Sequence, residues 1–566
     1  MSTPGELEAQ AAGSRPGRGR LARVRGNDYR VLQPPDGFIP ELTVSVIIPA
    51  YGGQDKLDLV LAGLARQTYP AELTQVIVVD NGSTPPLRLA EARPARTRLI
   101  VCAEPGRAAA RNAGLAEATG DVIHWLDSDV VLTPGAIEAH MRWHHAAPYM
   151  VVTGYIRFTS AEVPARLPDD LDKHFEPAEP HAWIVDLVER TNGLTDNPQR
   201  PFSLHVGGAT SVNARLVAAA GPMDEELILG QDTEMGYRLS QAGAVFVPEP
   251  AARAYHLGPT MRMRDKQPID RVSHALVADR IPAYRWLRGH PGRQWKVPYV
   301  TVVVDGTAGY DSVRATVDAL LAGTTPDISV LLLGPWDDLQ HERRAPLRDP
   351  DLDLVLVRGH YRHEGRVRLS AAEDVDPAVP FVLRLPVGWI PGEDSLARLL
   401  DLARDEGLGL VNVLLDESSQ GVVAGRLERL SAFARARIVA EPGEDLDDVV
   451  DAVSGVAWVE AETYGFTTEA ASPLGRRSAY RARVEAQADA ARLAAEAARL
   501  AKEAERLREQ VAKWREEAGR WRKTAVELRR EVGALRRQLS AATRTQKSLR
   551  GLVSTMKRTL GRRLRT

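Results

Sequence analysis

Two aspartates separated by one residue could hold a divalent metal ion. Asp127 and Asp129 flank Ser128 and directly follow the apolar run 122–126. Carboxylate oxygens are the ligands that Mn²⁺ and Mg²⁺ prefer, and two carboxylates in one turn leave the other positions of the ion open for phosphate oxygens. Taken alone the tripeptide is a weak indication, because Asp and Ser are also ordinary turn residues.

The run before these aspartates has the character of a buried parallel strand. Residues 43–49, 76–79 and 122–126 are three largely apolar runs, as in strands that helices cover on both faces. Apolar residues at helical spacing separate the first run from the second, which predicts a βαβ unit. Such units bind ligands at the carboxyl ends of their strands, so Asp80, which ends the second run, is expected near Asp127.

Five motifs in a fixed order resemble the family-two inverting glycosyltransferases, which have the GT-A fold. The resemblance covers about residues 43–259, which is under half of the chain. It implies an α/β domain that transfers a hexose-type sugar from a nucleoside diphosphate. The motifs are VSVIIPAY at 44–51, VIVVDNGS at 76–83, GRAAARNAGLAEATGD at 106–121, WLDSDVVLTPG at 125–135 and GQDTEMGYRL at 230–239.

The resemblance implies a binding site for the nucleotide sugar. The first loop would be Pro49, Ala50 and Tyr51, with the Tyr51 ring stacked on the base, and Asp80 would accept a hydrogen bond from the base, which favours uracil. Arginines on a helix surface and glycines in a turn also have ordinary structural roles. The other residues that the resemblance places beside the donor are Arg107, Arg111, Asp127, Ser128, Gly207 and Gly208.

The same resemblance assigns the catalytic groups. Asp232 would be the general base that takes the proton from the acceptor hydroxyl, so that attack opposite the departing diphosphate inverts the anomeric centre. Mn²⁺ or Mg²⁺, held by Asp127, Asp129 and His256, would neutralise that diphosphate. A lone histidine such as His256 is more often structural. Gln231 stands where many relatives have Glu, which removes a like charge beside the base.

The pattern of the first half begins again near residue 297. Residues 381–392 can be laid over 124–135 so that their Pro-Gly pairs coincide, and Arg384 and Pro386 then fall on Asp127 and Asp129. This register predicts a second domain of the same type that has lost its acidic motif. The alternative is an unrelated α/β domain, because all buried strands look alike.

After about residue 473 the composition shifts to Ala, Arg, Glu and Leu. From Leu493 to Leu539, steps of four and three residues taken in turn land only on apolar residues, and the positions between are mostly charged. This spacing predicts a coiled coil and therefore a homo-oligomer, with the number of strands left open. The alternative is a single helix packed on its own domain.

The tail 544–566 is basic and has no acidic residue. Its leucines, Val553 and Met556 recur at helical spacing, which is typical of an interfacial helix on an anionic membrane. A basic end to the coil or a site for an acidic partner are the alternatives. The domains expected are a disordered tail (1–40), a GT-A catalytic domain (41–290), a degenerate GT-A-like domain (297–470), a coiled coil (478–543) and the basic amphipathic tail (544–566).

Composition limits the class of protein. The chain has 73 Lys and Arg against 75 Asp and Glu, a net charge of -2, so nothing overall suggests nucleic acid. The single cysteine, Cys102, fits a reducing compartment, and no apolar run is long enough to cross a membrane or resembles a signal peptide. We expect a cytoplasmic protein, with peripheral contact at the inner face of the membrane if the tail binds lipid.

The resulting hypothesis is a metal-dependent inverting glycosyltransferase that uses a nucleoside diphosphate sugar, UDP-linked by preference. Its acceptor would be a hydroxyl of a glycan or of a lipid-linked molecule, as in polysaccharide biosynthesis at the cell envelope. The alternative is an inactive glycosyltransferase-like scaffold that oligomerises through its coiled coil. The retained Asp127, Asp129 and Asp232 favour the enzyme.

Overall fold

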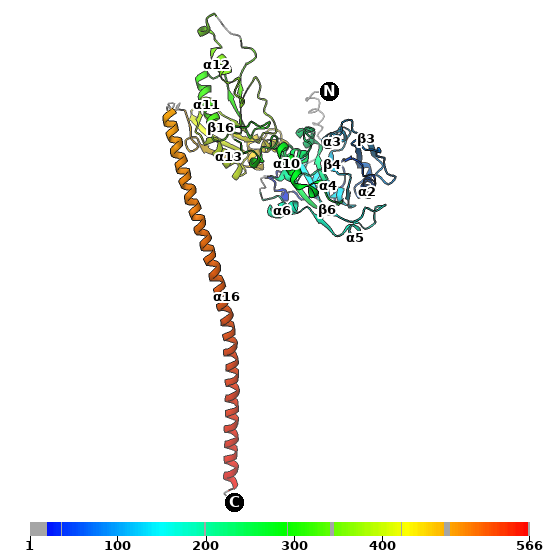
Figure 1. Cartoon of the computed structure of the whole chain (residues 1–566), viewed down its shortest axis with the longest axis vertical. Coiled ribbons are helices and arrows are strands. Elements are labelled where there is room, and N and C mark those ends of the chain that lie inside the picture. Colours follow the sequence, from blue (N-terminus) through cyan, green and yellow to red (C-terminus); the bar gives the residue numbers. More distant parts are fainter. Residues whose placement is uncertain are drawn as a thin grey trace. The chain divides into compact units, whose positions relative to one another are not determined.

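Two β-sheets with the same strand order form the first of two units, Met1–Ala470 (Figure 1). The second unit, Ala471–Thr566, contains one helix, α16 (Arg476–Arg563). This computed structural model describes residues 20–34, 37–196, 200–290, 292–339, 344–419, 421–468 and 476–563. The expected mixed α/β fold is confirmed.

The first sheet has a parallel half and a mixed half. Its order is β3-β2-β1-β4-β8-β6-β9-β5, with β7 paired to β6, and β3, β2, β1 and β4 run parallel. The turn to the mixed half comes at β8, which is antiparallel to both β4 and β6. The strands are β1 (Val44–Ala50), β2 (Thr74–Asp80), β3 (Thr97–Val101), β4 (Val122–Leu126), β5 (Val130–Leu132), β6 (Met150–Thr159), β7 (Ala178–Pro180), β8 (Ala209–Asn213) and β9 (Val245–Leu257).

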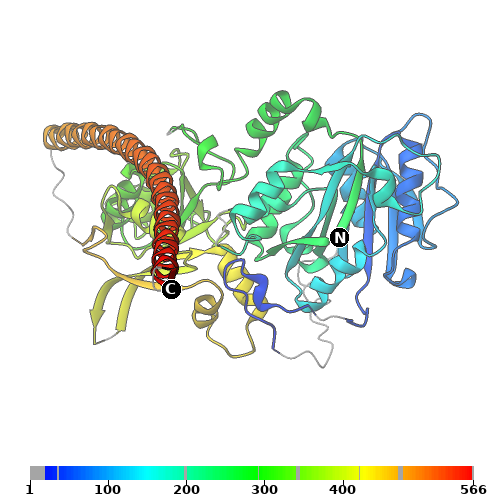
Figure 2. The same ribbon diagram turned by 90° about the horizontal axis from the view of Figure 1, so that it is seen from below.

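Helices lie on both faces of this sheet (Figure 2). β2 and β4 are buried at every residue, which explains why their sequences are apolar without alternation. The helices of this part are α2 (Gln54–Ala65), α3 (Arg107–Ala116), α4 (Ala136–Ala146), α5 (Leu171–Phe175), α6 (Ala182–Arg190), α7 (Ala214–Ala220), α8 (Gln231–Gln241), α9 (Met261–Arg264) and α10 (Lys266–Val277).

The second sheet repeats the topology of the first. Its order is β12-β11-β10-β13-β16-β15-β17, with β12, β11, β10 and β13 parallel and β16 antiparallel to both neighbours. The short antiparallel pair β14–β18 corresponds to the antiparallel pair β5–β9 of the first half. The strands of this sheet are β10 (Val300–Asp305), β11 (Ile328–Leu333), β12 (Val367–Ser370), β13 (Phe381–Arg384), β15 (Leu410–Ser418), β16 (Gly421–Arg429) and β17 (Val456–Glu460), and β14 (Ile390–Pro391) and β18 (Phe466–Thr467) form a separate two-stranded sheet. Its helices are α11 (Tyr310–Ala322), α12 (Leu352–Tyr361), α13 (Ser395–Asp405), α14 (Leu430–Val439) and α15 (Leu446–Val453).

The strand pairings correct the predicted register of the repeat by two residues. Val44 of β1 pairs with Val122, and Val300 of β10, the equivalent strand, pairs with Phe381. The following helices α4 and α13 begin at the same offset. Asp127 and Asp129 therefore correspond to Pro386 and Gly388, rather than to Arg384 and Pro386. The Pro-Gly pairs misled the alignment because each precedes its helix by a different length. The acidic motif is still absent from the second copy.

A tryptophan covers the end of the second sheet that corresponds to the predicted nucleotide loop of the first. By the same pairings Gly306 and Gly334 stand at the positions of Ala50 and Asp80. A Cβ on Gly306 would come within 2.5 Å of the Trp336 ring and one on Gly334 within 2.8 Å. The buried indole donates to the Leu332 carbonyl at 2.9 Å. Glycine is therefore required at both strand ends because the indole lies across them.

Part of the predicted N-terminal tail is ordered, which makes that prediction wrong for residues 20–34. Val24 is fully buried, and the Asn27 side chain bonds to both the N–H and the carbonyl of Phe246 on β9. Buried Arg435 of α14 donates to the carbonyls of Val24 and Gly243. The N-terminal segment thus joins the two sheets. Residues 1–19 of the predicted tail lie outside the described residues.

The helix α16 runs without a break across the predicted boundary between coiled coil and basic tail at residue 543. Its apolar side chains from Leu493 to Met556 are exposed. The coiled coil itself stays a prediction, because one chain is present. Among the helices of the described residues, none combines the length and the apolar character needed to cross a membrane.

Candidate active site

Five ionisable side chains influence one another electrostatically at the carboxyl ends of the first sheet. The carboxyl of Asp127, directly after β4, has its pKa raised, first by burial and then by the charges of Asp129 and Asp232. Arg111 and His256 act in the opposite direction. Residues from a strand end, two helices and β9 therefore act on one another here, at the edge where parallel strands bind ligands.

Arg111 forms an ion pair with Asp127 instead of facing solvent. Its Nη2 lies 2.7 Å from Asp127 Oδ1 and 3.2 Å from the Gly207 carbonyl oxygen. A side chain at Gly207 would overlap the guanidinium, and a Cβ at Gly208 would come within 3.2 Å of Asp127 Oδ2. The loop therefore packs closely around the Arg111–Asp127 pair. Arg111 is thus in position to act on a nucleotide through Asp127.

Asp129 lies between a histidine and a lysine. His256 Nε2 is 3.5 Å from Asp129 Oδ1, and Lys56 Nζ is 3.7 Å from Asp129 Oδ2. The other ring nitrogen, His256 Nδ1, is 2.7 Å from the Gly258 carbonyl oxygen, so Nδ1 must carry the proton. Nε2 is consequently the ring nitrogen that faces Asp129, and it is the atom through which His256 could ligate a metal.

The predicted three-residue metal site is assembled only in part. Across the described residues, no three His, Cys, Asp or Glu side chains are placed to hold one ion. Asp127 is paired with Arg111, whereas the 3.5 Å between Asp129 Oδ1 and His256 Nε2 is close to the separation of two ligands on one ion. The Asp129–His256 pair therefore fits a divalent cation, and the cation itself stays a prediction.

Sequence reasoning missed Lys56. It lies in the first turn of α2 and donates to the Leu257 carbonyl at 2.6 Å, beside His256. Because α2 follows β1, its first turn starts at the carboxyl edge of the sheet, and that geometry was the available indication. The ammonium group of Lys56 therefore places positive charge beside the expected position of the diphosphate.

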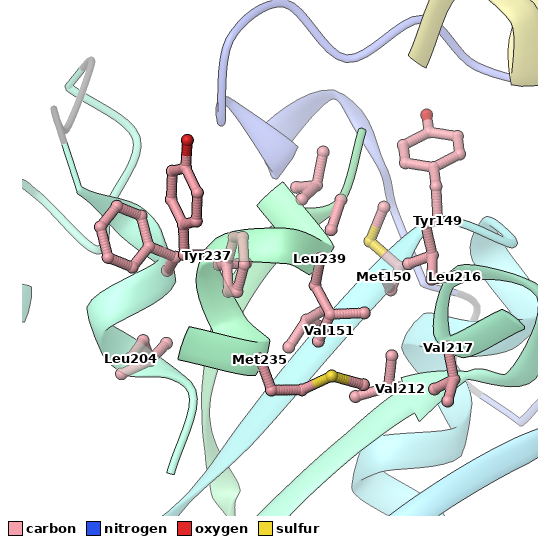
Figure 3. Packing of buried hydrophobic residues seen from close by; sticks show 14 of the residues in the cluster. Tyr149, Met150, Val151, Leu204, Val212, Leu216, Val217, Met235, Tyr237 and Leu239 are labelled. Carbon is pink, nitrogen blue, oxygen red and sulfur yellow. The ribbon is translucent and has the colours of Figure 1, made fainter. Parts of the chain in front are cut away.

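Asp232 lies in the first turn of α8, which the core holds firmly. Met235 and Leu239 of this helix pack with Val151 and Val212 of the sheet (Figure 3). The His205 ring donates from Nδ1 to the Asp232 carbonyl oxygen at 2.7 Å. The backbone of Asp232 is thereby fixed, while its side chain remains partly exposed at the site.

Two close contacts surround the start of α8. Gly230, the N-cap, has φ 86°, and a Cβ there would come within 2.6 Å of Val277 on α10, so α10 packs directly against the turn before Asp232. Gln231 is buried, and its Oε1 has no hydrogen-bond partner in the described part of the chain. A carboxylate at Gln231 would be buried beside Asp232, so the neutral amide avoids that repulsion.

The predicted base-binding residues are only partly placed for that role. Asp80 is buried, and its two carboxylate oxygens accept the N–H groups of Ser83 at 2.8 Å and Leu87 at 2.9 Å. Burial would raise the pKa of Asp80, but these hydrogen bonds outweigh it and lower the pKa. Asp80 therefore shapes the loop after β2, and its contact with a base stays a prediction.

The remaining predicted donor residues lie around the same edge. Pro49 and Ala50 end β1, and the Tyr51 ring that follows is 74% exposed and free to stack. Arg107 is exposed at the first position of α3, and Ser128 is half-buried between the two aspartates. The role of these residues in binding the donor stays a prediction.

Three histidines are buried behind the site, around Ser211 of β8. His140 Nδ1 and His144 Nε2 each lie 2.8 Å from Ser211 Oγ, and the His124 ring packs against that of His140 at 4.7 Å. Burial lowers the pKa of His124 to about 4 and that of His144 to about 3. The cluster is therefore neutral in the folded protein at neutral pH.

Acidification should destabilise this first unit. The unfolded chain binds protons on these histidines below about pH 6.5 and the folded chain does not, so the free energy of unfolding falls as pH drops from about 6.5 toward 4. Each fully shifted histidine contributes on the order of 3 kcal/mol at the acid end. Thermal unfolding between pH 7.5 and 4 checks this, and His144→Gln should flatten the profile. Identical profiles for wild type and variant would contradict it.

Comparisons with known proteins agree with this arrangement. Residues 45–197 match the model of Glycosyl transferase family 2. The pre-mycofactocin glycosyltransferase of Mycobacterium tuberculosis is 28% identical over 218 residues, 38% of this chain and 42% of that protein. The hyaluronan synthase of Pasteurella multocida is 24% identical over 403 residues, 64% of this chain and 39% of that protein. The chain thus spans about two fifths of the length of these curated relatives.

A solved structure is similar at a lower level. The mannosyltransferase PcManGT of Pyrobaculum calidifontis, in complex with GDP-Man and Mn²⁺, is 17% identical, with 50% of this chain and 73% of that chain covered. The TM-score is 0.30.

Proposed function

Because residues 45–197, which supply Asp127, Asp129, Arg111 and Lys56, match the model of Glycosyl transferase family 2, we propose that the protein is an inverting glycosyltransferase. It would transfer a sugar from a nucleoside diphosphate, UDP by preference, to a hydroxyl of a glycan or a lipid-linked acceptor. The observation that supports this best is that Asp129 lies beside His256 and Lys56 and Asp127 is paired with Arg111 at one strand edge, where the charge of Asp232 also acts on Asp127.

Asp232 is proposed as the general base. Its carboxylate would accept the proton of the attacking hydroxyl as the new bond forms at the anomeric carbon and the diphosphate leaves from the opposite face. The α8 helix and its contact with His205 hold the Asp232 backbone in place for this. The neutral Gln231 leaves Asp232 without a carboxylate at the preceding position of the chain.

Asp129 and His256 are proposed to hold a divalent cation, Mn²⁺ or Mg²⁺. When bound, the ion would supply Lewis-acid stabilisation of the leaving diphosphate. Lys56 adds positive charge at the same place, and Arg111 keeps the Asp127 carboxylate oriented toward the donor. The exposed Tyr51 ring would stack on the base, and the chain would bind the donor sugar over Gly207 and Gly208.

The test is release of nucleoside diphosphate from a panel of UDP, GDP and dTDP sugars, with Mn²⁺, with Mg²⁺ and with EDTA. We expect turnover with one nucleotide class and loss of turnover in EDTA. Absence of release from every donor, with and without acceptor glycans, would contradict the proposal and favour the inactive scaffold. The panel also identifies the donor.

The full chain should bind one nucleotide per polypeptide. In the second sheet Trp336 covers the strand ends, and Gly334 replaces the carboxylate of Asp80, so the indole occupies the position that corresponds to the predicted nucleotide loop and the counterpart of Asp80 is missing there. Calorimetric titration with UDP and Mn²⁺ should give a single site. Trp336→Ala should lower stability by about 3–5 kcal/mol without adding a second site. Two sites in the wild type would refute this interpretation.

A further inference from the structure

The apolar residues of α16 that recur from Leu493 to Leu539 in alternating steps of four and three form a row along the helix, here called the seam. The seam has two kinds of position, and each has a regular composition. Numbered as a heptad abcdefg, the seam places its larger side chains at d and smaller ones at most a positions. In the described helix the large members are exposed, from 48% at Val532 to 73% at Trp521. The a positions are Ala497, Ala504, Val511, Ala518, Ala525, Val532 and Leu539, and the d positions are Leu493, Leu500, Leu507, Trp514, Trp521, Leu528 and Leu535.

The positions that flank the seam carry opposite charges. Position e is Arg in five successive heptads, and position g is Glu or an uncharged residue throughout the described seam. The acidic g residues are Glu496, Glu503, Glu517 and Glu531, and the basic e residues are Arg508, Arg515, Arg522, Arg529 and Arg536. One edge of the seam is therefore basic and the other is acidic or neutral.

This separation of charge distinguishes the two ways in which a second copy could dock. In a parallel, in-register pair, each g residue faces the e residue five positions later on the other helix, which brings Glu503, Glu517 and Glu531 opposite arginines. In an antiparallel pair g faces g and e faces e, so arginines would meet arginines. Like charges placed together are destabilising, so the parallel arrangement is favoured.

The charged groups are available for such contacts. The described part of α16 forms two ion pairs, Arg520 with Glu516 and Arg499 with Glu496. Within that part, Glu503, Glu517 and Glu531 form no ion pair with their own helix. Their facing partners in the parallel arrangement, Arg508, Arg522 and Arg536, are also without one.

Side-chain size at the seam favours two strands. Val511 and Val532 are β-branched residues at a, and leucine occupies most d positions, which is the combination found in parallel dimers. The two indoles, Trp514 and Trp521, are large for a d position. Ala518, which lies between the two indoles, and Ala525, which follows the second, leave room for them, as large and small residues alternate in well-packed cores.

The seam also continues in register into the basic tail. Leu549 and Met556 fall on d and Val553 on a, and α16 is helical throughout this stretch. One polar residue, Gln546, occupies an a position, where a polar side chain specifies register at a cost in stability. These three apolar residues are the same ones that an interfacial helix would place in lipid, so a dimer would bury them first.

We infer that α16 pairs with α16 of a second copy of this chain as a parallel, in-register two-stranded coiled coil that reaches at least Met556. The partner is another copy because the sequence supplies both halves of each Glu–Arg contact. The inference does not depend on the transferase activity. It places the two basic C-terminal ends side by side.

The first test is the mass and charge dependence of the full chain. Equilibrium sedimentation should give twice the 61.9 kDa of one chain. Reversal of Glu503, Glu517 and Glu531 to Arg should weaken self-association by at least about tenfold, and so should reversal of Arg508, Arg522 and Arg536 to Glu. A mixture of the two variants should restore the dimer as a heterodimer.

A matched control keeps the change in charge but moves it off the seam. Glu509, Glu516 and Glu527 occupy outer positions, and their reversal to Arg should leave the dimer intact. A monomeric wild type, a trimer, or equal weakening by the control and seam variants would overturn the inference.

Cross-linking through an introduced cysteine determines the relative orientation of the two α16 helices. Ala518→Cys at an a position should form an intermolecular disulfide on mild oxidation, because in-register parallel helices bring the two sulfurs together. Glu516→Cys at an outer position should not. The native Cys102 is buried and serves as the background. Failure of Ala518→Cys to cross-link in a protein that is still dimeric would exclude the parallel register.

Discussion

Asp232→Asn should abolish transfer while leaving donor binding within about twofold of wild type. A general base contributes roughly 10²–10⁴-fold to turnover, and the amide cannot accept the proton of the acceptor hydroxyl. The substitution keeps the shape of the side chain, and the backbone of Asp232 stays held by His205 and by the packing of α8. Turnover is measured by release of nucleoside diphosphate and donor binding by calorimetry.

The exposed Asp186 provides the control. It lies on α6, its partner is Arg190 on the same helix, and Asp186→Asn removes one carboxylate from the surface. It should leave both turnover and binding unchanged. If Asp232→Asn turned over as fast as wild type, another residue would have to be the base. If donor binding failed as well, Asp232 would belong to the donor site.

Three parallel strands of the first sheet, β1, β2 and β4, could be predicted from sequence, because buried parallel strands are apolar on both faces. β4 has the bounds expected from its apolar run, and β1 and β2 differ from expectation by one or two residues at an end. The mixed half of the sheet could not be read, since β6 and β9 pair through contacts that are distant in sequence. The ordered structure of residues 20–34 was not predicted, because Asn27, which anchors this segment, forms hydrogen bonds to residues more than 160 positions away.

The second copy shows how a motif can mislead. Pro391-Gly392 resembles Pro134-Gly135, yet the hydrogen-bonded partners of β13 place Pro386 and Gly388 at the positions of the two aspartates. Pro-Gly is a common turn and fixes no register, whereas strand pairing does. Trp336 could not be foreseen either, because its contact with Gly306 depends on the geometry of the strand ends.

The candidate site was predicted as a set of positions rather than as a set of contacts. The sequence indicated that Asp127 and Asp129 would lie together, but it assigned both to one ion. In the structure the two aspartates have different partners. Arg111 forms an ion pair with Asp127, whereas Lys56 and His256 lie beside Asp129. Charge pairing between α3 and β4 has no local pattern, so only the fold could reveal it.

Asp129→Ala should remove the dependence of donor binding on a divalent cation. In wild type we expect Mn²⁺ to tighten UDP-sugar binding by at least about tenfold over EDTA, because an ion held by Asp129 and His256 would neutralise charge on the diphosphate. Without the Asp129 carboxylate, His256 alone offers one ligand, and Lys56 loses its nearest carboxylate. Donor affinity with Mn²⁺ should then fall to the EDTA value, and turnover should fall with it.

Lys56→Met separates the role of the cation from that of protein charge. This variant leaves both proposed ligands in place, so Mn²⁺ should still tighten donor binding, although from a weaker starting affinity because one positive charge near the diphosphate is gone. Titration calorimetry of wild type and both variants, in Mn²⁺ and in EDTA, gives the comparison. If Asp129→Ala kept the full Mn²⁺ effect, the ion would have to bind elsewhere. If wild type bound donor equally well in EDTA, Lys56 and Arg111 would be the groups that neutralise the diphosphate, and the Asp129–His256 pair would have to serve another purpose.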